Sequence, residues 1–315
     1  MPQGARVVII GAGAVGATFA YTLQISGVAR EIVIVDIDTK RAEGEVMDLN
    51  HGLFFTPPVE IRAGGYADCA GAAIVVIAAG AKQKPGQSRL ELVGQNVRIC
   101  NSIVSSILEH TDDAILLMVT NPVDVLTYAA LKASGLPPER VLGSGTVLDS
   151  ARFRFLLSSH CGIDPHNVHA YIIGEHGDSE VAAWSMAHLA GVKLSDYCKV
   201  CGRNCGPLEY GSMVQQVRES AYHIIDAKGA TSYGIGLALE KIVRSILRDE
   251  RSVLTVSRLV TGLYGIADVC LSVPVVVDRG GAGRVVCGEL STQEQVELKA
   301  SAETLKTVLR DVGLQ

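Results

Sequence analysis

Short apolar runs alternate with longer helical patterns through the first half of the chain, and this alternation constrains the fold more than any other feature. The runs are rich in Val and Ile and read RVVII, EIVIV, AAIVVIA, DAILLMVT and RVLGSG. Continuous apolar strands of this kind are typical of a parallel sheet that helices cover on both faces. Residues 1–145 are therefore predicted to form an open, doubly wound α/β domain of the Rossmann type.

The pattern changes in the second half. A strand-like run, NVHAYIIG, precedes helical sequence at about 208–249, and two later runs, SVLTVSRLV and ADVCLSVPVVV, look like antiparallel strands. An amphipathic helix is expected at about 292–309. Because a chain of 315 residues is long for a single core, we predict a second, α+β domain over residues 146–315.

Composition excludes several classes of protein. Hydrophobic residues make up 48% of the chain and charged residues 19%, which is not the balance of a disordered protein, and a net charge of −5 gives no footprint for nucleic acid. Residues 7–29 carry no charge, but four glycines and three polar side chains interrupt them, so a strand, turn and helix are favoured over a signal peptide or membrane span. We expect a cytoplasmic protein with a small-molecule partner and its eight cysteines as thiols.

The segment VVIIGAGAVGATFAYTL contains glycines at G-x-G-x-x-G spacing between a predicted strand and a predicted helix. In such a loop Gly11 permits a tight turn, Gly13 lets backbone approach a pyrophosphate, and Gly16 lets the helix lie close to the strand. The helix N-terminus then attracts the phosphates. The sequence predicts a dinucleotide site here.

Asp36 ends the next predicted strand, 20 residues after Gly16. A carboxylate at this place accepts hydrogen bonds from ribose hydroxyls and repels a 2′-phosphate, which favours NAD over NADP. The alternative is a glycine-rich turn followed by a solvated Asp36.

A second group of polar residues is typical of acid–base chemistry. His176 lies in a glycine-flanked bend, IIGEHGDSE, after a predicted strand, and Asp149 and Arg152 are three residues apart at the start of a predicted helix. Alone, His176 is more often structural, and the other two residues can be a local salt bridge. The functional interpretation is that Asp149 orients the imidazole while Arg152 binds a substrate carboxylate through two parallel hydrogen bonds.

Six segments in order make the chain resemble the L-lactate and malate dehydrogenase family, and most of all its bacterial lactate-specific members. They are GAGAVG, AGAKQKPGQSRLELV, TNPVDV, GSGTVLDSARFRFLL, IIGEHGDSE and KGATSYGI. The resemblance implies NADH-dependent reduction of pyruvate to L-lactate, with His176 as acid/base, Asp149 as its partner, Arg152 on the carboxylate, and Arg89 and Asn121 near the reacting oxygen. It implies cofactor contacts from Gly11, Gly13, Val15, Gly16, Asp36 and Asn121.

Substrate choice is expected to depend on Gln83. Members of the family that prefer malate have an arginine at this position, and a second substrate carboxylate beside the neutral Gln83 would be buried without a partner. Lys82 and Lys84, which could supply that charge, are expected to face solvent. Thr231 in KGATSYG resembles the residue on the opposite wall of the substrate pocket. Malate dehydrogenase and a non-catalytic NAD-binding protein are the alternatives.

Arg154 follows Arg152 by two positions and therefore points about 200° away around the helix axis. The resemblance implies that Arg154 and His169 bind fructose 1,6-bisphosphate, as in activated bacterial members of the family. Duplication of this site across a two-fold axis implies a homotetramer with the activator between subunits. The alternative is a surface arginine and a strand histidine.

Three cysteines depart from the family pattern. Cys198, Cys201 and Cys205 have C-x₂-C-x₃-C spacing in YCKVCGRNC, but no fourth metal ligand is evident nearby. We predict surface thiols that could form a disulfide under oxidation, and no metal site.

Overall fold

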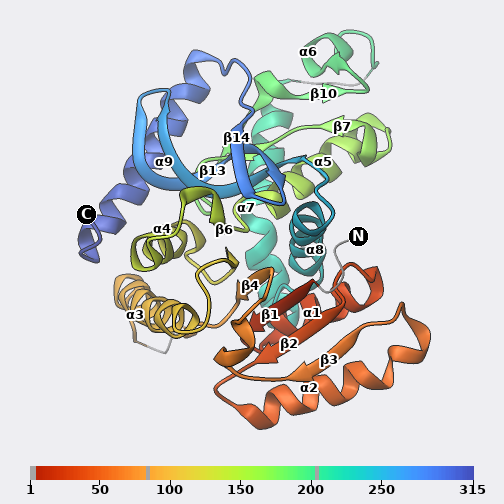
Figure 1. Ribbon diagram of the computed structural model, residues 1–315. Coiled ribbons are helices and arrows are strands. Elements are labelled where there is room, and N and C mark those ends of the chain that lie inside the picture. Colours follow the sequence, from red (N-terminus) through yellow and green to blue (C-terminus); the bar gives the residue numbers. More distant parts are fainter. Residues whose placement is uncertain (1–4, 83–85, 203–205) are drawn as a thin grey trace.

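The structure is a computed structural model that describes residues 5–82, 86–202 and 206–315. One nine-stranded sheet runs through the molecule in the order β14-β13-β12-β6-β5-β4-β1-β2-β3 (Figure 1). Helices cover both faces of this sheet. The predicted fold class, a doubly wound parallel sheet followed by an α+β region, is confirmed.

Six strands form the parallel part of the sheet, and their central residues are buried on both faces. The five predicted strands are present. The sixth, β3, escaped prediction because it is a four-residue edge strand, EIRA, in which only Ile61 is fully buried. The bounds are β1 (Arg6–Ile10), β2 (Glu31–Val35), β3 (Glu60–Ala63), β4 (Ile74–Ile77), β5 (Ile115–Met118) and β6 (Val141–Gly143).

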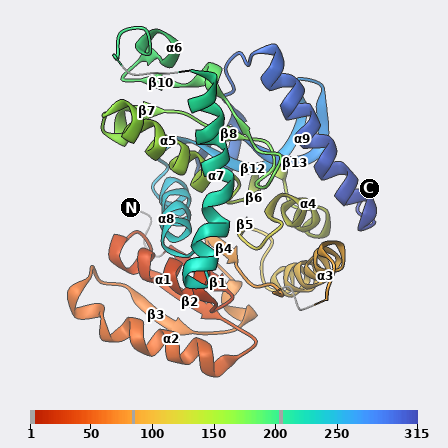
Figure 2. The same ribbon diagram turned by 180° about the vertical axis from the view of Figure 1, so that it is seen from behind.

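The helices between these strands lie on the two faces of the sheet. Helices α1 (Ala14–Ser26) and α2 (Thr39–His51) pack on one side, and α3 (Arg89–Leu108) and α4 (Val123–Ser134) pack together on the other (Figures 1 and 2). Short 3₁₀ turns, η1 (Leu53–Phe55), η2 (Tyr66–Cys69) and η3 (Pro138–Arg140), lie in the connections.

Antiparallel strands extend the sheet at β6. They are β12 (Ser252–Leu263), β13 (Ile266–Asp278) and β14 (Gly281–Val285), and β12 pairs with β6 through Ser257 and Gly143. A Cβ at Gly143 would collide with the Thr127 hydroxyl oxygen and lie 3.0 Å from the Ser257 Cβ, so glycine lets β6 approach both α4 and β12. The two predicted antiparallel strands are therefore present, but they continue the first sheet and do not form a separate one.

The remaining elements surround this extension. The predicted helix at 208–249 is two helices, α7 (Pro207–Lys228) and α8 (Tyr233–Leu247), and the predicted last helix is α9 (Thr292–Asp311). The predicted strand NVHAYIIG is two short strands, because β7 pairs with β10 whereas β8 pairs with β9. The other bounds are α5 (Val147–Cys161), α6 (Leu194–Tyr197), β7 (Val168–His169), β8 (Ile172–Ile173), β9 (Val181–Ala182), β10 (His188–Leu189), β11 (Val192–Lys193), η4 (Pro165–Asn167) and η5 (Trp184–Met186).

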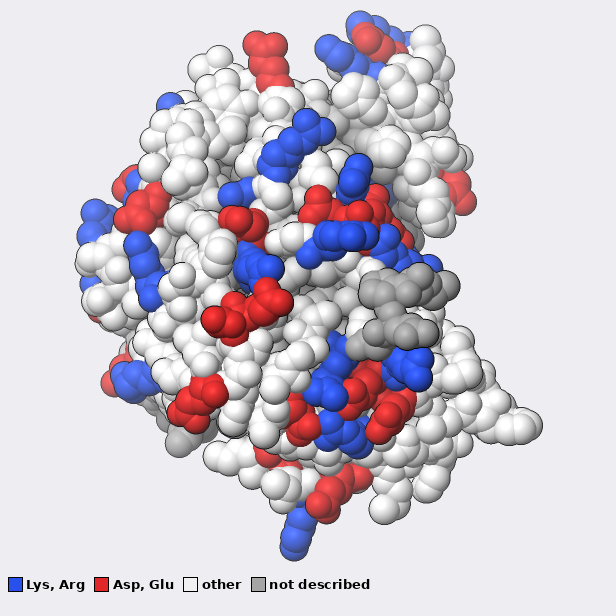
Figure 3. All heavy atoms as spheres, in the orientation of Figure 1, with Lys and Arg blue, Asp and Glu red and all other residues white. Residues whose placement is uncertain are grey.

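The surface carries charges of both signs. Lys and Arg side chains are interspersed with Asp and Glu side chains over the face in Figure 3, so no large field of one sign forms there. None of the helices in the described part of the chain combines the length and the apolar character of a membrane span.

Candidate active site

A cavity of about 780 Å³ opens at the carboxyl ends of β1, β2 and β4, where ligands bind in open α/β sheets. Its walls come from five separate segments of the chain: the end of β1 with the loop after it, the end of β2 with the start of α2, the 3₁₀ turn η2, the segment after β4, and α3. The residues that line it are Ile10, Gly11, Gly13, Val35, Asp36, Ile37, Arg41, Tyr66, Ala78, Ala79, Gly80, Ala81, Lys82, Arg98, Ile99, Ser102 and Ile103.

The glycine loop fits a dinucleotide for steric reasons. Gly11 has φ +111°, and a Cβ there would lie 2.7 Å from the Ala79 amide nitrogen. A Cβ at Gly16 would collide with the Gly11 carbonyl, whereas one at Gly13 would meet no described atom within 4 Å, so this backbone is open to the cavity. Gly13 caps α1 without a side-chain hydrogen bond, which leaves the first amides of α1 available to phosphate oxygens. Val15 packs half-buried against the core.

Asp36 lies at the wall of the same cavity. Its Oδ2 accepts a hydrogen bond from the Ala12 amide at 2.6 Å, and its Oδ1 accepts one from the Asp38 amide at 2.9 Å. These bonds hold the carboxylate between the glycine loop and the start of α2. A carboxylate at this place suits ribose hydroxyls and opposes a 2′-phosphate.

Three cations at the cavity were not predicted as cofactor contacts: Arg41, Lys82 and Arg98. Lys82 is exposed, as predicted, but at the cavity rim. Arg41 and Arg98 lie one on α2 and the other on α3, so spacing along the sequence gave no sign that they would converge. Cations here favour a ligand with phosphate groups.

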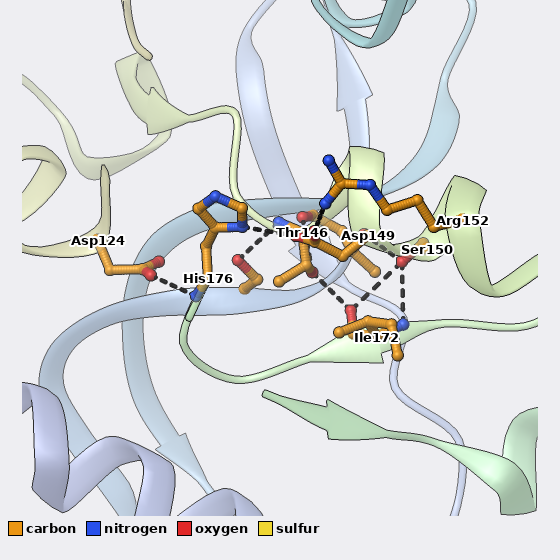
Figure 4. A network of polar contacts seen from close by, with 9 residues as sticks. Asp124, Thr146, Asp149, Ser150, Arg152, Ile172 and His176 are labelled. Carbon is orange, nitrogen blue, oxygen red and sulfur yellow. Dashed lines mark hydrogen bonds and ion pairs between the residues drawn. The ribbon is translucent and has the colours of Figure 1, made fainter. Parts of the chain in front are cut away.

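His176, Asp149 and Arg152 come together on adjoining elements, as Figure 4 shows. The His176 Nδ1 lies 2.6 Å from Asp149 Oδ2, and Arg152 donates from a guanidinium nitrogen to Asp149 Oδ1 at 2.8 Å. Asp149 is buried, with 3% of its side chain exposed, whereas 25% of the His176 side chain is exposed. The Asp149 carboxylate therefore forms the local salt bridge with Arg152 and also the contact with the His176 imidazole, so both interpretations of the sequence apply to it.

The surrounding charges set the protonation of this group. Burial is the largest single influence and lowers the pKa of His176, but the charge and hydrogen bond of Asp149, together with the charges of Asp124 and Glu180, outweigh it and raise this pKa to about 9. Burial alone would raise the pKa of Asp149, yet the charges of His176 and Arg152 hold it below its ordinary value. At neutral pH the group is therefore an imidazolium held by a carboxylate, which is the state of a proton donor.

A buried polar network fixes the first turn of α5 against β8 (Figure 4). Ser150 Oγ accepts a hydrogen bond from the Ile172 amide at 2.9 Å and lies 3.0 Å from the Thr255 hydroxyl. Thr146 donates to the Ile172 carbonyl at 2.5 Å. These bonds hold Asp149 in place by fixing the helix turn that carries it.

Asp124 belongs to the same group, although the sequence analysis did not single it out. Its Oδ2 accepts a hydrogen bond from the His176 amide at 2.8 Å. Asp124 is the acidic residue of the TNPVDV segment, so a charged residue within a recognised motif was the available signal. Burial raises its pKa to about 6.

Arg89 lies at the edge of the site. It begins α3 and is not within the preceding loop, and the N-cap Ser88 accepts a hydrogen bond from the Glu91 amide. The Arg89 side chain is 72% exposed and lies 3.6 Å from Asp178, two residues beyond His176. The structure thus brings Arg89 to the His176 segment.

Four further predicted residues have different outcomes. The Asn121 carbonyl accepts a hydrogen bond from Asn96, and Asn121 itself is exposed between β5 and α4. Thr231 is half-buried in the connection between α7 and α8, and so is not in a helix. Gln83 and Lys84 lie outside the described residues.

The predicted effector residues flank a second cavity, of about 350 Å³, which His169, Tyr171 and His188 help to line. Arg154 donates to the Ala170 carbonyl at 2.9 Å, and its guanidinium lies 5.1 Å from the centre of the Tyr171 ring. His169 is exposed and pairs with His188 across β7 and β10. Arg154 and His169 are thus close to one surface cavity, away from Arg152.

The cysteine segment lies beyond α6. Cys198 Sγ is 3.2 Å from the Tyr210 hydroxyl, and Cys201 Sγ is 3.5 Å from the Cys198 carbonyl. Cys205 lies outside the described residues. Over residues 5–82, 86–202 and 206–315, no three His, Cys, Asp or Glu side chains are grouped so that they could hold a metal ion.

Two family models match the chain, one over each half. The family model of the lactate/malate dehydrogenase NAD-binding domain matches residues 5–143, and that of the lactate/malate dehydrogenase α/β C-terminal domain matches residues 146–313. The chain belongs to the lactate/malate dehydrogenase family. The predicted resemblance is thereby confirmed, as are the predictions of an NAD-dependent oxidoreductase and of NAD as the cofactor.

Individual members of the lactate/malate dehydrogenase family are similar over nearly the whole chain. The L-lactate dehydrogenase of Thermoanaerobacter sp. (strain X514) is 51% identical, covering 98% of this chain and 99% of that protein, and that of Acetivibrio thermocellus is 50% identical, with 98% of each covered. A crystal structure of the minor L-lactate dehydrogenase from Enterococcus mundtii in the ligands-bound form has a TM-score of 0.96 at 40% identity, covering 99% of each chain.

Proposed function

We propose that this protein is an L-lactate dehydrogenase that reversibly reduces pyruvate to L-lactate with NADH. The observation that carries the proposal is the buried Asp149 carboxylate, which holds an imidazolium on one oxygen and an arginine on the other. The curated relatives, which are named L-lactate dehydrogenases and are about 50% identical over nearly the whole chain, support it.

Each residue has a role that follows from its chemistry. Arg152 binds the pyruvate carboxylate with the guanidinium nitrogens that Asp149 does not occupy. His176 donates its proton to the keto oxygen, and bound NADH supplies the hydride to the keto carbon. Arg89, after a movement toward the substrate, stabilises the charge that develops on that oxygen, and Asn121 lies beside it. The resemblance to the family assigns Gln83 and Thr231 to the choice of the substrate's side group.

We also propose that residues 1–145 bind NAD and residues 146–315 bind substrate. The cavity beside Gly11, Gly13, Gly16 and Asp36 supports the first assignment, and the position of His176 and Arg152 supports the second. A cytoplasmic location is proposed as well. The seven described cysteines form no disulfide with one another, as a reducing compartment would require.

Turnover with pyruvate and with oxaloacetate tests the function. We expect kcat/KM for pyruvate to exceed that for oxaloacetate by about 10²-fold or more, because a second carboxylate beside Gln83 would be buried without a partner. Gln83→Arg should reverse the preference, and the same change at the exposed Gln293 of α9 should not. Faster oxaloacetate turnover by the wild type would identify a malate dehydrogenase, and no turnover with either substrate a non-catalytic NAD-binding protein.

The two directions of reaction should depend oppositely on pH. Pyruvate reduction requires protonated His176, so kcat/KM for pyruvate should fall as pH rises through about 9. Lactate oxidation requires neutral His176, so kcat/KM for lactate should rise over the same range. Asp149→Asn removes the main charge that raises this pKa and should move the fall to lower pH. Initial rates between pH 6 and 10 measure both effects. An unchanged midpoint in the variant would contradict the role of Asp149.

We propose that fructose 1,6-bisphosphate activates the enzyme by binding beside Arg154 and His169. The adjacent cavity, the arginine and the two paired histidines support a phosphate site. We expect the activation to be lost in Arg154→Gln and weakened in His169→Gln. His166→Gln, which changes an exposed histidine outside this cavity, is the control. Activation of His169→Gln equal to that of the wild type would remove the role of His169.

A homotetramer is proposed on the basis of exposed apolar side chains. Helices α1, α2 and α8 lie together (Figure 2), and the large apolar side chains that they and η1 leave exposed are typical of a subunit interface. These side chains are Tyr21, Ile25, Met47, Phe54, Phe55 and Leu237, all at least half exposed.

A further inference from the structure

Glu180 is a buried acid four residues after His176. It ends the segment 174–180 that carries His176, and only 3% of the residue is exposed. Its Oε1 is buried and has no hydrogen-bond partner within the described part of the chain. A buried carboxyl oxygen without a partner is costly, above all when the group is ionised. Glu180 is therefore a group whose charge state must matter to its surroundings.

An arginine on α7 lies next to this acid without pairing with its carboxyl group. Arg218 donates from Nη2 to the Glu180 backbone carbonyl at 2.7 Å. Its Nε is buried and, like Glu180 Oε1, has no hydrogen-bond partner among the described residues. An acceptor and a donor thus stay unpaired on neighbouring residues, which fits a carboxyl group that is neutral in this state.

The charged groups that act on Glu180 come from three elements packed around it. They are Asp149 and Arg152 on α5, His176 in its own segment, and Arg218 on α7. Burial is the largest influence and, together with the Asp149 charge, raises the pKa of Glu180 to about 8, although the three cations oppose this rise. The charge of Arg152 therefore acts on Glu180 as well as on the proposed substrate carboxylate.

We propose that Glu180 is a positioning residue for the substrate carboxylate, acting through Arg152 and Arg218 according to whether it carries a proton. When Glu180 is neutral, it does not compete with the substrate carboxylate for the charge of Arg152. When Glu180 is ionised, it attracts Arg152 and its Oε1 accepts a hydrogen bond from Arg218 Nε, so substrate binding weakens. This role rests on the proposed function, because it requires a substrate carboxylate at Arg152.

Binding and protonation are then linked. If the substrate binds best when Glu180 is neutral, bound substrate must in turn raise the proton affinity of Glu180 by the same factor. The complex should therefore take up one proton at Glu180 in addition to the proton that His176 needs. The two protons should be separable, since they belong to different side chains.

Proton uptake measures this directly. The protein saturated with NADH is mixed with oxamate, the amide analogue of pyruvate, in weakly buffered solution at pH 9 with an indicator dye. The wild type should take up more than about one proton per subunit, because at this pH Glu180 is largely deprotonated and His176 is partly deprotonated before oxamate binds. Glu180→Gln, which mimics the neutral acid, should take up less than one.

Two further variants and two contrary outcomes complete the experiment. Glu297→Gln makes the same change at an exposed site on α9 and should behave as the wild type. Arg218→Gln removes a cation that opposes protonation of Glu180, so the second uptake should move to higher pH. Uptake of one proton or less by the wild type, or equal uptake by Glu180→Gln, would overturn the inference alone. Failure of oxamate to bind at pH 6.5 would overturn the proposed function as well.

Steady-state kinetics separate this role from a structural one. Glu180→Gln should match the wild type at pH 6.5. Between pH 6.5 and 9 the KM of the wild type for pyruvate should rise more than the KM of Glu180→Gln, and the difference between the two rises should reach up to about tenfold. At each pH the kcat of Glu180→Gln should equal that of the wild type. A loss of kcat at both pH values, with the pH dependence of KM kept, would show that Glu180 only supports the fold.

Discussion

His176→Gln should lower kcat/KM for pyruvate by about 10²- to 10⁴-fold, the usual contribution of a positioned general acid. Glutamine retains a polar side chain of similar reach but has no proton to give at neutral pH. The buried Asp149 carboxylate would keep its bond to Arg152, so the substrate carboxylate site should survive. Initial rates at saturating NADH, with pyruvate varied at pH 6.5, measure the loss.

Controls distinguish lost chemistry from lost structure in this variant. NADH binding, followed by fluorescence titration, should be unchanged, because the cofactor cavity lies at the ends of β1, β2 and β4. His166→Gln is the matched variant, since His166 is exposed and pairs only with the neighbouring Asp164 among the described residues. Retention of more than about a tenth of the activity by His176→Gln would show that another group donates the proton.

Arg152→Lys should weaken pyruvate binding by about 2 to 5 kcal/mol, which corresponds to a roughly 30- to 4,000-fold rise in KM. The guanidinium can bind Asp149 and a carboxylate at once because its donors point in fixed directions. A lysine ammonium would have to divide a single point charge between Asp149 and the substrate. Only 14% of the Arg152 side chain is exposed, so water cannot easily replace the missing hydrogen bonds.

A matched Arg→Lys change tests whether this loss is specific. Arg310 is exposed on α9, and Arg310→Lys should leave both KM and kcat as in the wild type. Arg152→Lys should also keep its affinity for NADH, because Arg152 does not line the cofactor cavity. A KM within threefold of the wild-type value would contradict the assignment of Arg152 to the substrate carboxylate.

The sequence predicted individual elements with different success, for identifiable reasons. Buried strands such as β4 and β5 are recognisable because every residue is apolar, whereas the edge strand β3 is short and carries Glu60 and Arg62. The helical run at 208–249 is broken directly after α7 at Gly229, which has φ +82°, so a glycine was the local signal for this break. NVHAYIIG became two strands because its two ends pair with different segments, β10 and β9, and the local sequence does not show this pairing.

By itself, the sequence predicted the nucleotide-binding half and the cofactor, and its resemblance to the family implied the acid–base group. These depend on local rules: glycines where a Cβ would collide, a carboxylate after the second strand, and an acid and an arginine one helical turn apart. Only the tertiary structure decided that Asp149 contacts His176 and Arg152 together and that Asp124 accepts a hydrogen bond from the His176 amide. It also decided that Glu180 Oε1 and Arg218 Nε are buried without a hydrogen-bond partner among the described residues. These groups come from separate elements of the fold. Their pKa values are shifted by burial and by the charges of the neighbouring groups, and no local sequence pattern encodes those neighbours.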